Sequence, residues 1–268
     1  MDDLSAERVC RGLGTAIIGR ECIYHPEIGS TNEEACRLAE QGAREGTVVI
    51  CDFQTAGRGR LDRRWEAPRG SSLLLSLVFR PDLAASETAQ LTMLCGLAVL
   101  DAVRGTCGLD AGLKWPNDIV RRDAKLGGIL TELEISAQDV VYAVVGIGLN
   151  VNVDPSELPG GLLFPATSIS RELGRRVERL SVLQALLQAV EVRYLALRSG
   201  RSPHQDWAAH LVTLGKPVTL TGDGDAEVVG IAEDVGADGA LLVRLADGTL
   251  VRVLSGDVLP GTRVGAGS

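Results

Sequence analysis

Aromatic residues and lysine are scarce in this 268-residue chain. Phe, Trp and Tyr make up only 3% of the residues, so a large core must come from the aliphatic side chains that dominate the 45% hydrophobic fraction. Three of the 27 basic residues are lysines, and two of these, Lys114 and Lys125, lie in one short segment. An ammonium is a compact point charge and a guanidinium a planar fork, so this pairing indicates a specific task for lysine.

The sequence also lacks the features of membrane, exported and metal-binding proteins. No segment approaches about 18 uninterrupted apolar residues, which excludes an obvious membrane span. The acidic start MDDLSAERVC does not resemble an export signal. The six cysteines form no CxxC pair, so we expect reduced thiols in a cytoplasmic protein. The formal net charge of −8 argues against nucleic acid and membranes as partners.

Apolar periodicity predicts an α+β fold, because helical and strand patterns alternate irregularly. One helix is expected to start at Ser30 or Thr31, with Glu33 or Glu34 completing a capping box, and to end at Gly42. The other expected helices cover residues 4–20, 86–104, 181–199 and 203–213. Strands are expected over residues 47–53, 72–80, 113–121, 127–135 and 140–151.

The pattern of apolar and polar residues changes after Leu214. Short alternating strands are separated by Asp-Gly pairs at 223–224, 238–239 and 247–248, which are strong hairpin signals. We therefore expect a catalytic or binding domain over residues 1–213, a small antiparallel β domain over 214–262, and a disordered tail over 263–268.

The segment QTAGRGRLDRRW, residues 54–65, gathers positive charge in an acidic chain. Glycine permits close approach of the backbone to a ligand, arginine binds phosphate oxygens, and Trp65 offers a ring for stacking. A nucleotide or an acyl phosphate would fit this set, although the Walker pattern is absent. A solvated turn with a buried tryptophan explains the same residues, and an RNA contact is disfavoured by the net charge.

Three further segments carry candidate site residues. KWPNDI, residues 114–119, places a proline inside a strand pattern, which is typical of an edge, a bulge or a site. In KLGGIL, residues 125–130, two glycines follow a lysine. Their backbone carries no side chains, so the ammonium could point into a cavity above it. A lysine at the exposed edge of a hairpin is an equal alternative. In GIGLNVN, residues 146–152, the alternate glycines indicate close packing or ligand binding.

Taken together, GSTN, QTAGRGRLDRRW, KWPND, KLGGIL and GIGLNVN resemble the biotin protein ligase family in their order and spacing. The resemblance covers about residues 22–260, and the pair GRGR…W and KWPND is its most specific part. It implies a mixed-sheet catalytic domain like that of class II aminoacyl-tRNA synthetases, followed by a C-terminal SH3-like β-barrel. It also implies that ATP, with Mg²⁺, activates biotin to biotinoyl-5′-AMP, and that a lysine of a biotin carboxyl carrier domain of a carboxylase then accepts the biotin.

The resemblance further implies roles for individual residues. Lys125, Arg58 and Arg60 are the expected catalytic residues, with Lys125 at the biotin carboxyl and the α-phosphate. Trp65 is expected to stack on adenine, and the nucleotide-binding set is Trp65, Asn117, Asp118 and Asn150. The expected biotin-binding residues are Ser30, Thr31, Asn32, Gln54, Gly57, Arg58, Gly59, Arg60, Lys125, Gly127 and Gly128. The sequence assigns no metal ligands.

The chain departs from some family members in two places. Only 29 residues precede Ser30 and they carry no basic stripe, so we expect a ligase without a DNA-binding domain or repressor role. Leu61 and Asp62 replace a more usual basic–glycine pair, which would alter the loop and its retention of adenylate. The oligomeric state, monomer or homodimer, stays open.

Two alternatives stay open beside this interpretation. A lipoate or octanoate ligase shares the fold and the adenylation chemistry, but it should lack GRGR…W and KWPND. A non-catalytic biotin sensor would bind the same ligand, yet binding alone would tolerate loss of Lys125, Arg58 and Arg60. Turnover of adenylate separates the sensor from the enzyme.

Overall fold

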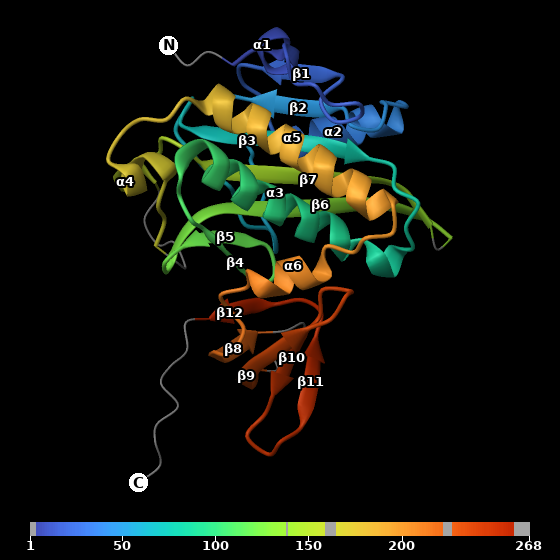
Figure 1. The fold of residues 1–268 in the computed structure, drawn as a ribbon, viewed down its shortest axis with the longest axis vertical. Helices are drawn as coiled ribbons and strands as arrows, with labels where there is room; N and C mark the ends of the chain where they lie inside the picture. Colours follow the sequence, from blue (N-terminus) through green and yellow to red (C-terminus); the bar gives the residue numbers. More distant parts are fainter. Residues whose placement is uncertain (1–3, 138, 159–164, 222–226, 260–268) are drawn as a thin grey trace.

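The computed structural model describes residues 4–137, 139–158, 165–221 and 227–259 and contains two β-sheets (Figure 1). The larger has the strand order β1-β2-β3-β7-β6-β5-β4. β1 and β2 pair in parallel and the other neighbours are antiparallel, which confirms the mixed sheet. Its strands are β1 (Cys22–His25), β2 (Val48–Cys51), β3 (Ser72–Phe79), β4 (Gly112–Lys114), β5 (Asp118–Arg121), β6 (Ala124–Ser136) and β7 (Asp139–Asn150).

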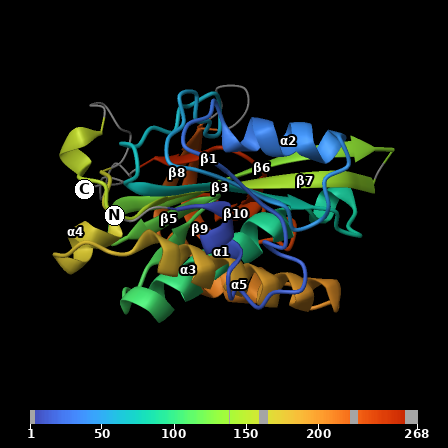
Figure 2. The same cartoon turned by 90° about the horizontal axis from the view of Figure 1, so that it is seen from above.

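Helices cover both faces of the larger sheet, α3 and α5 on one and α2 on the other (Figure 2). Alternate residues of β2 therefore enter two separate hydrophobic clusters: Val48 and Ile50 join the main core, and Val49 packs in the cluster under α2. The helices are α1 (Ala6–Cys10), α2 (Thr31–Glu40), α3 (Ala89–Cys107), α4 (Ile169–Leu173), α5 (Arg179–Arg198) and α6 (His204–Ala209), with short 3₁₀ turns η1 (Ala85–Glu87) and η2 (Pro155–Glu157).

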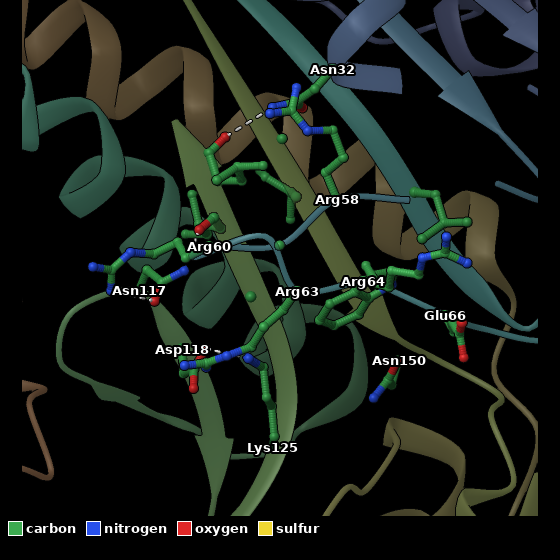
Figure 3. A pocket seen from close by; sticks show the side chains of 18 of the residues that line it. Asn32, Arg58, Arg60, Arg63, Arg64, Glu66, Asn117, Asp118, Lys125 and Asn150 are labelled. Carbon is green, nitrogen blue, oxygen red and sulfur yellow. Dashed lines mark hydrogen bonds and ion pairs between the residues drawn. The ribbon is translucent and has the colours of Figure 1, made fainter. Parts of the chain in front are cut away.

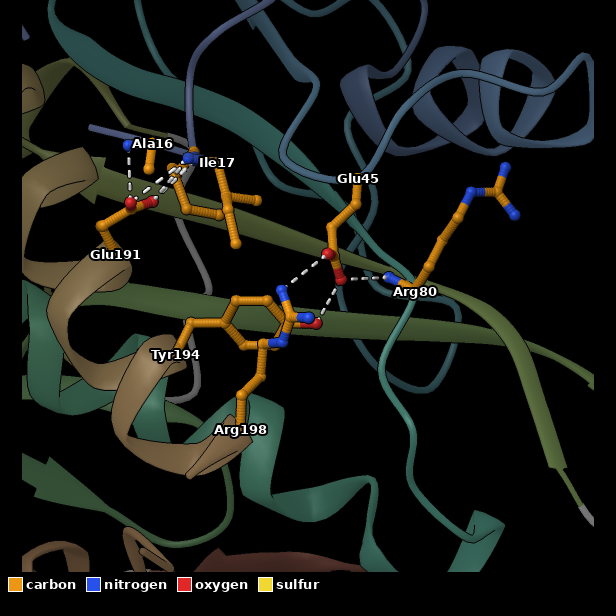
Figure 4. A network of polar contacts seen from close by, with 8 residues as sticks. Ala16, Ile17, Glu45, Arg80, Glu191, Tyr194 and Arg198 are labelled. Carbon is orange, nitrogen blue, oxygen red and sulfur yellow. Dashed lines mark hydrogen bonds and ion pairs between the residues drawn. The ribbon is translucent and has the colours of Figure 1, made fainter. Parts of the chain in front are cut away.

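The N-terminal segment corrects one prediction. The expected helix over residues 4–20 is wrong beyond α1, because Gly12, Gly14 and Gly19 adopt positive φ angles that a helix does not allow. The segment is instead held by the buried Glu191 of α5, as Figure 4 shows. The Glu191 carboxylate accepts the backbone N–H groups of Ala16 at 2.7 Å and Ile18 at 2.8 Å.

A second anchor in the same view ties α5 to the loop before β2 (Figure 4). The Glu45 carboxylate accepts the Tyr194 hydroxyl, the guanidinium of Arg198 at 3.3 Å and the backbone N–H of Arg80 at 3.2 Å. The phenol of Tyr194 also packs edge-on against Phe79, with 4.9 Å between ring centroids. These contacts fix α5 across the sheet.

Two local predictions need further correction. Ser30 is the N-cap residue of α2, but its side chain makes no capping hydrogen bond, so the expected capping box is wrong. The strand expected over 113–121 is split into β4 and β5, because Trp115, Pro116 and Asn117 form the turn between them. Proline lacks the N–H that a continuous strand would need.

Among the described residues, α5 is the one helix long and apolar enough to cross a membrane. Length and composition alone are weak evidence for a membrane-spanning helix, because a buried core helix shares both properties. Here α5 packs in the main core, where Leu183, Leu186 and Leu187 are fully buried.

The smaller sheet has the order β11-β10-β9-β8-β12 and is antiparallel throughout. The turns expected at 238–239 and 247–248 fall between its strands, whereas 223–224 lies outside the described residues. The sheet adjoins the larger one through Trp115, whose indole N–H donates to the Gly239 carbonyl at 2.8 Å. Its strands are β8 (Pro217–Thr221), β9 (Glu227–Val235), β10 (Leu241–Arg244), β11 (Leu250–Val253) and β12 (Asp257–Leu259).

Candidate active site

A cavity of about 360 Å³ lies where the expected site residues meet (Figure 3). Its walls come from the start of α2, the 54–66 segment, the β4–β5 turn, β6, β7 and β12. This volume is in the range of small-molecule sites. Of the residues expected from the sequence, the following line it: Ser30, Thr31, Asn32, Gln54, Arg58, Gly59, Arg60, Trp65, Asn117, Asp118, Lys125, Gly128 and Asn150.

The arginine loop, defined as residues 54–65, is folded back on itself and not a free surface turn. The Trp65 N–H donates to the Gly57 carbonyl at 2.9 Å, and the Gly59 N–H donates to the Arg63 carbonyl at 2.7 Å. Leu61 and Asp62, at the tip, both have positive φ angles, which is unusual for residues with a side chain. The Leu61–Asp62 departure thus lies at the most strained point of the loop.

Each of three loop arginines contacts a different element. Arg58 pairs with Glu132 of β6 at 2.8 Å. Arg60 donates to the Asn117 side-chain carbonyl at 3.4 Å in the β4–β5 turn. Arg63 forms an ion pair with Asp257 of β12. The loop is therefore held against the cavity by contacts with both sheets.

The Trp65 ring packs closely against the backbone of the large sheet, because two glycines leave room for it. A Cβ at Gly148 would lie 2.6 Å from the indole ring, and one at Gly128 would lie 3.4 Å from it. The buried indole N–H of Trp65 has no hydrogen-bond partner in the described structure. The ring is thus positioned inside the cavity with a donor available to a ligand.

Lys125 points into the cavity from the start of β6. Its ammonium lies 2.5 Å from the Asp118 carboxylate on the adjacent strand and 5.8 Å from the centre of the Trp65 ring. Its backbone N–H donates to the Pro165 carbonyl at 2.7 Å, which fixes the start of the strand. The arrangement places a cation, its counter-ion and an aromatic face together.

The start of α2 forms the opposite, polar end of the cavity. Gln54 accepts the backbone N–H of Thr31 at 2.8 Å and the Thr31 hydroxyl at 3.1 Å. Ser76 donates to the Asn32 side-chain carbonyl at 2.6 Å, and the Asn32 amide donates to Glu132 at 2.7 Å. A Cβ at Gly146 would collide with Asn32, so this glycine serves packing.

Two of the expected nucleotide-binding residues also support the protein backbone. The Asn117 amide donates to the Ile129 carbonyl at 2.5 Å, which ties the β4–β5 turn to β6. The Asn150 amide donates to the Thr167 carbonyl at 3.1 Å. Both also line the cavity, so their side chains hold its walls.

Gly57 and Gly127 do not line the cavity. A Cβ at Gly57 would lie 2.4 Å from the Trp65 carbonyl, and one at Gly127 would lie 2.7 Å from the Gly148 carbonyl. Both glycines permit close backbone packing, at the base of the loop and between β6 and β7. Sequence patterns could not separate this role from ligand binding.

Sequence reasoning missed several charged residues of the site. Arg63, Arg64, Glu66, Lys114 and Asp257 line the cavity, and Glu132 lies behind it. The sequence could have indicated Lys114, because it is the first residue of the KWPND motif. Asp257 carried no local signal, since its place depends on how the small sheet sits against the large one.

Comparisons with known proteins show the family of the chain. The model of the biotin/lipoate A/B protein ligase family matches residues 26–150, and the model of the biotin protein ligase C terminal domain matches residues 213–259. The chain is 36% identical over 261 residues to the biotin–[acetyl-CoA-carboxylase] ligase of Mycobacterium tuberculosis, covering 93% of this chain and 94% of that protein. It is 35% identical over 260 residues to the bifunctional ligase/repressor BirA of Bacillus subtilis, covering 95% of this chain and 78% of that protein.

A solved structure shows the same fold. The biotin protein ligase from Aquifex aeolicus in complex with biotin and ATP matches with a TM-score of 0.74 and 29% identity, over 89% of this chain and 97% of that one. The expected fold class, a mixed-sheet synthetase-like domain with a small C-terminal β domain, is thereby confirmed. The chain belongs to the biotin protein ligases of the biotin/lipoate A/B protein ligase family.

Proposed function

We propose that this protein is an ATP-dependent ligase that attaches biotin to a lysine of a biotin carboxyl carrier domain. In the first half-reaction a biotin carboxylate oxygen attacks the α-phosphorus of ATP, the bond to the β-phosphate oxygen breaks, and pyrophosphate leaves. In the second, the neutral amine of the acceptor lysine attacks the acyl carbon of biotinoyl-5′-AMP. An amide forms, the acyl–oxygen bond breaks, and AMP leaves while the amine gives up its proton.

The observation that carries this proposal is one cavity with a polar end, an apolar wall and a cationic end. Thr31 and Gln54 stand at the polar end and Lys125 at the cationic end, with Ile129 and Ile147 among the lining residues. Biotin has a polar ureido ring, an apolar middle and a carboxylate, and its carboxylate must meet the phosphates of ATP. Cations already in position reduce the repulsion between these anions and stabilise the transition state.

Lys125 is the proposed catalytic cation. In the described structure its ammonium is held by Asp118 at 2.5 Å, so its position does not have to be created when substrates bind. The carboxylate of biotin and the α-phosphate would then share this ammonium, as charge builds on the phosphate oxygens. Asp118 acts as a positioning residue in this scheme.

The arginine loop is the proposed cover of the adenylate. Arg58 and Arg60 would bind phosphate and carboxylate oxygens from above, and Trp65 would stack on adenine or donate its indole N–H to a ligand oxygen. Ser30, Thr31, Asn32 and Gln54 would bind the ureido ring, and Asn150 would contact the adenine. Exclusion of water by the loop would protect the mixed anhydride from hydrolysis.

Magnesium is proposed to arrive with ATP. Within the described part of the chain, no group of three or more His, Cys, Asp or Glu side chains could hold a metal ion by itself. Mg²⁺ commonly binds through one or two carboxylates together with substrate phosphates. Asp118 and the amide oxygen of Asn117 are the groups of this cavity that would contact it, and the ion would neutralise phosphate charge.

The remaining expectations follow from the reaction. The nucleophile comes from the acceptor, so no Ser or Cys nucleophile is needed. A carrier domain of a biotin-dependent carboxylase is the proposed partner, and the cytoplasm, where ATP and carboxylases meet, the proposed location. We infer a domain boundary near residues 213–214, while the tail over 263–268 lies outside the described residues.

Biotin-dependent exchange between ATP and pyrophosphate tests the proposal. We expect exchange with biotin and none with lipoate or octanoate, at fixed Mg²⁺. Exchange with lipoate would assign the chain to the sister activity. Tight binding of biotin without exchange of any acid would contradict the ligase and favour a sensor.

A further inference from the structure

Cys10 and Cys22 form a pair of thiols that no step of the proposed reaction uses. Cys10 is the last residue of α1, and Cys22 is the first residue of β1. Both are half-buried, and neither lines the cavity. The other four cysteines of the chain lie on α2, β2 and α3. The pair is therefore a separate feature of the N-terminal part of the fold.

The two sulfur atoms share one hydrogen-bond acceptor. The Cys10 Sγ donates to the Gly19 carbonyl at 3.3 Å, and the Cys22 Sγ donates to the same carbonyl at 3.4 Å. The side chains of the two cysteines are also hydrogen-bonded to each other. A shared acceptor and a direct contact place the sulfurs side by side, so only a small movement brings them to the disulfide bond length of about 2 Å.

The backbone between the two cysteines is held by the rest of the fold. The carboxylate of Glu191 in α5 accepts the backbone N–H of Ile18 at 2.8 Å. The Gly19 N–H donates to the Gly46 carbonyl at 2.8 Å, which fixes the peptide unit next to the shared acceptor. The sulfurs therefore meet because the backbone positions them, and a bond between them would not require the segment to be rebuilt.

The surroundings of Cys22 determine when such a bond would form. Burial raises the pKa of the Cys22 thiol, and its contact with Cys10 raises this pKa further. The thiolate is the reactive form of cysteine, so Cys22 is a slow nucleophile at neutral pH. The pair stays reduced in a reducing compartment, and its oxidation requires an oxidant and becomes faster as pH rises.

We propose that Cys10 and Cys22 form a reversible disulfide that crosslinks α1 to β1, with a small-molecule disulfide as the oxidant. One thiol loses its proton and its sulfur attacks the oxidant, whose S–S bond breaks and releases one small thiolate. The second cysteine then loses its proton and attacks the mixed disulfide, and the other small thiolate leaves. The protein gives up two electrons and two protons, and the oxidant becomes two small thiols.

The crosslink would act on stability, because it closes a glycine-rich loop at one edge of the large sheet. β1 is the terminal strand of this sheet (Figure 1). The loop between the cysteines contains Gly12, Gly14 and Gly19, all with positive φ angles, and glycine gives the unfolded chain much conformational freedom. A disulfide across the loop removes part of this freedom from the unfolded state and so favours the folded one.

Oxidation of the full-length protein with oxidised glutathione tests the proposal. We expect the number of thiols titrated in denaturant to fall by two from the six of the reduced chain, and dithiothreitol to restore them. Trypsin followed by a glutamate-specific protease separates Cys10, Cys22 and Cys36, because Arg11, Arg20 and Glu27 lie between them. Mass spectrometry should then find the Cys10 and Cys22 peptides linked. Six remaining thiols, glutathione adducts without a link, or a link between other cysteines would overturn the proposal.

Thermal unfolding of matched variants gives a second readout, which does not depend on the proposed ligase activity. Oxidation should raise the Tm of wild type by about 5 °C or more. Cys107→Ser, at the half-buried end of α3, is the control and should show the same rise. Cys10→Ser and Cys22→Ser should show none, because each lacks one sulfur of the pair. A rise in either of these variants equal to that of Cys107→Ser would contradict the crosslink.

Discussion

At the scale of single residues, the site depends on charges held in place before any ligand arrives. Lys125 is fixed by Asp118, and Arg58 by Glu132, at 2.5 and 2.8 Å. Such pairs keep long side chains in one orientation and reduce the reorganisation needed in the transition state. The pairs are partly exposed, so we assign them to positioning and not to stability.

Lys125→Ala should remove about 3 kcal/mol of transition-state stabilisation, comparable to the loss of one strong oxyanion donor. Both half-reactions should slow, because the ammonium is proposed to act on the acyl phosphate in each. Exchange kinetics and single-turnover transfer measure this, with Lys216→Ala as the matched control. A near-normal exchange rate would remove Lys125 from the catalytic set.

At the scale of elements, the arginine loop is the proposed cover of the adenylate, and its local geometry can be tested. Its two glycines, Gly57 and Gly59, look equivalent in the sequence but have different surroundings. A methyl group on Gly57 would meet the Trp65 carbonyl at 2.4 Å, whereas one on Gly59 would reach Arg63 at an ordinary contact of 3.4 Å. The base of the loop therefore cannot accept a side chain, and the position nearer the tip can.

Gly57→Ala should displace Trp65 and allow biotinoyl-5′-AMP to escape from the enzyme severalfold faster than from wild type. Gly59→Ala is the matched control and should stay near wild type, since its methyl group needs no backbone shift. Release of labelled adenylate after gel filtration measures both. Equal retention by the two variants would show that the loop does not cover the adenylate.

At the scale of the whole molecule, the small C-terminal sheet completes the site. Asp257 and Val258 of β12 line the cavity, and Asp257 pairs with Arg63 of the arginine loop. The indole of Trp115, in the β4–β5 turn, joins the two sheets through the Gly239 carbonyl. Movement of one sheet against the other would therefore open the loop and disturb Lys114 together.

Asp257→Asn should weaken the closed loop by removing the charge that faces Arg63. We expect faster loss of adenylate and a higher KM for ATP, with thermal stability close to wild type because the pair is partly exposed. Glu227→Gln, an exposed carboxylate at the start of β9, is the control for a charge change in the same sheet. An adenylate lifetime equal in the two variants would exclude Asp257 from loop closure.

The sequence by itself determined most of the elements and the family. Strands over 72–80 and 140–151 were predictable because continuous aliphatic runs cannot be solvated, and the Asp-Gly turns of the small sheet because few residues tolerate that backbone. The motifs also identified 13 of the residues that line the cavity. Local chemistry was enough for these, since each depends on neighbours in the chain.

Only the tertiary structure decided which groups act together. It split 113–121 at Pro116, showed that Gly57 and Gly127 serve packing, and added Asp257 and Glu132 to the site. It also placed Lys114 beside the Asp118–Lys125 pair. Electrostatic interactions depend on distance in space and on burial, and a sequence specifies neither until the chain is folded.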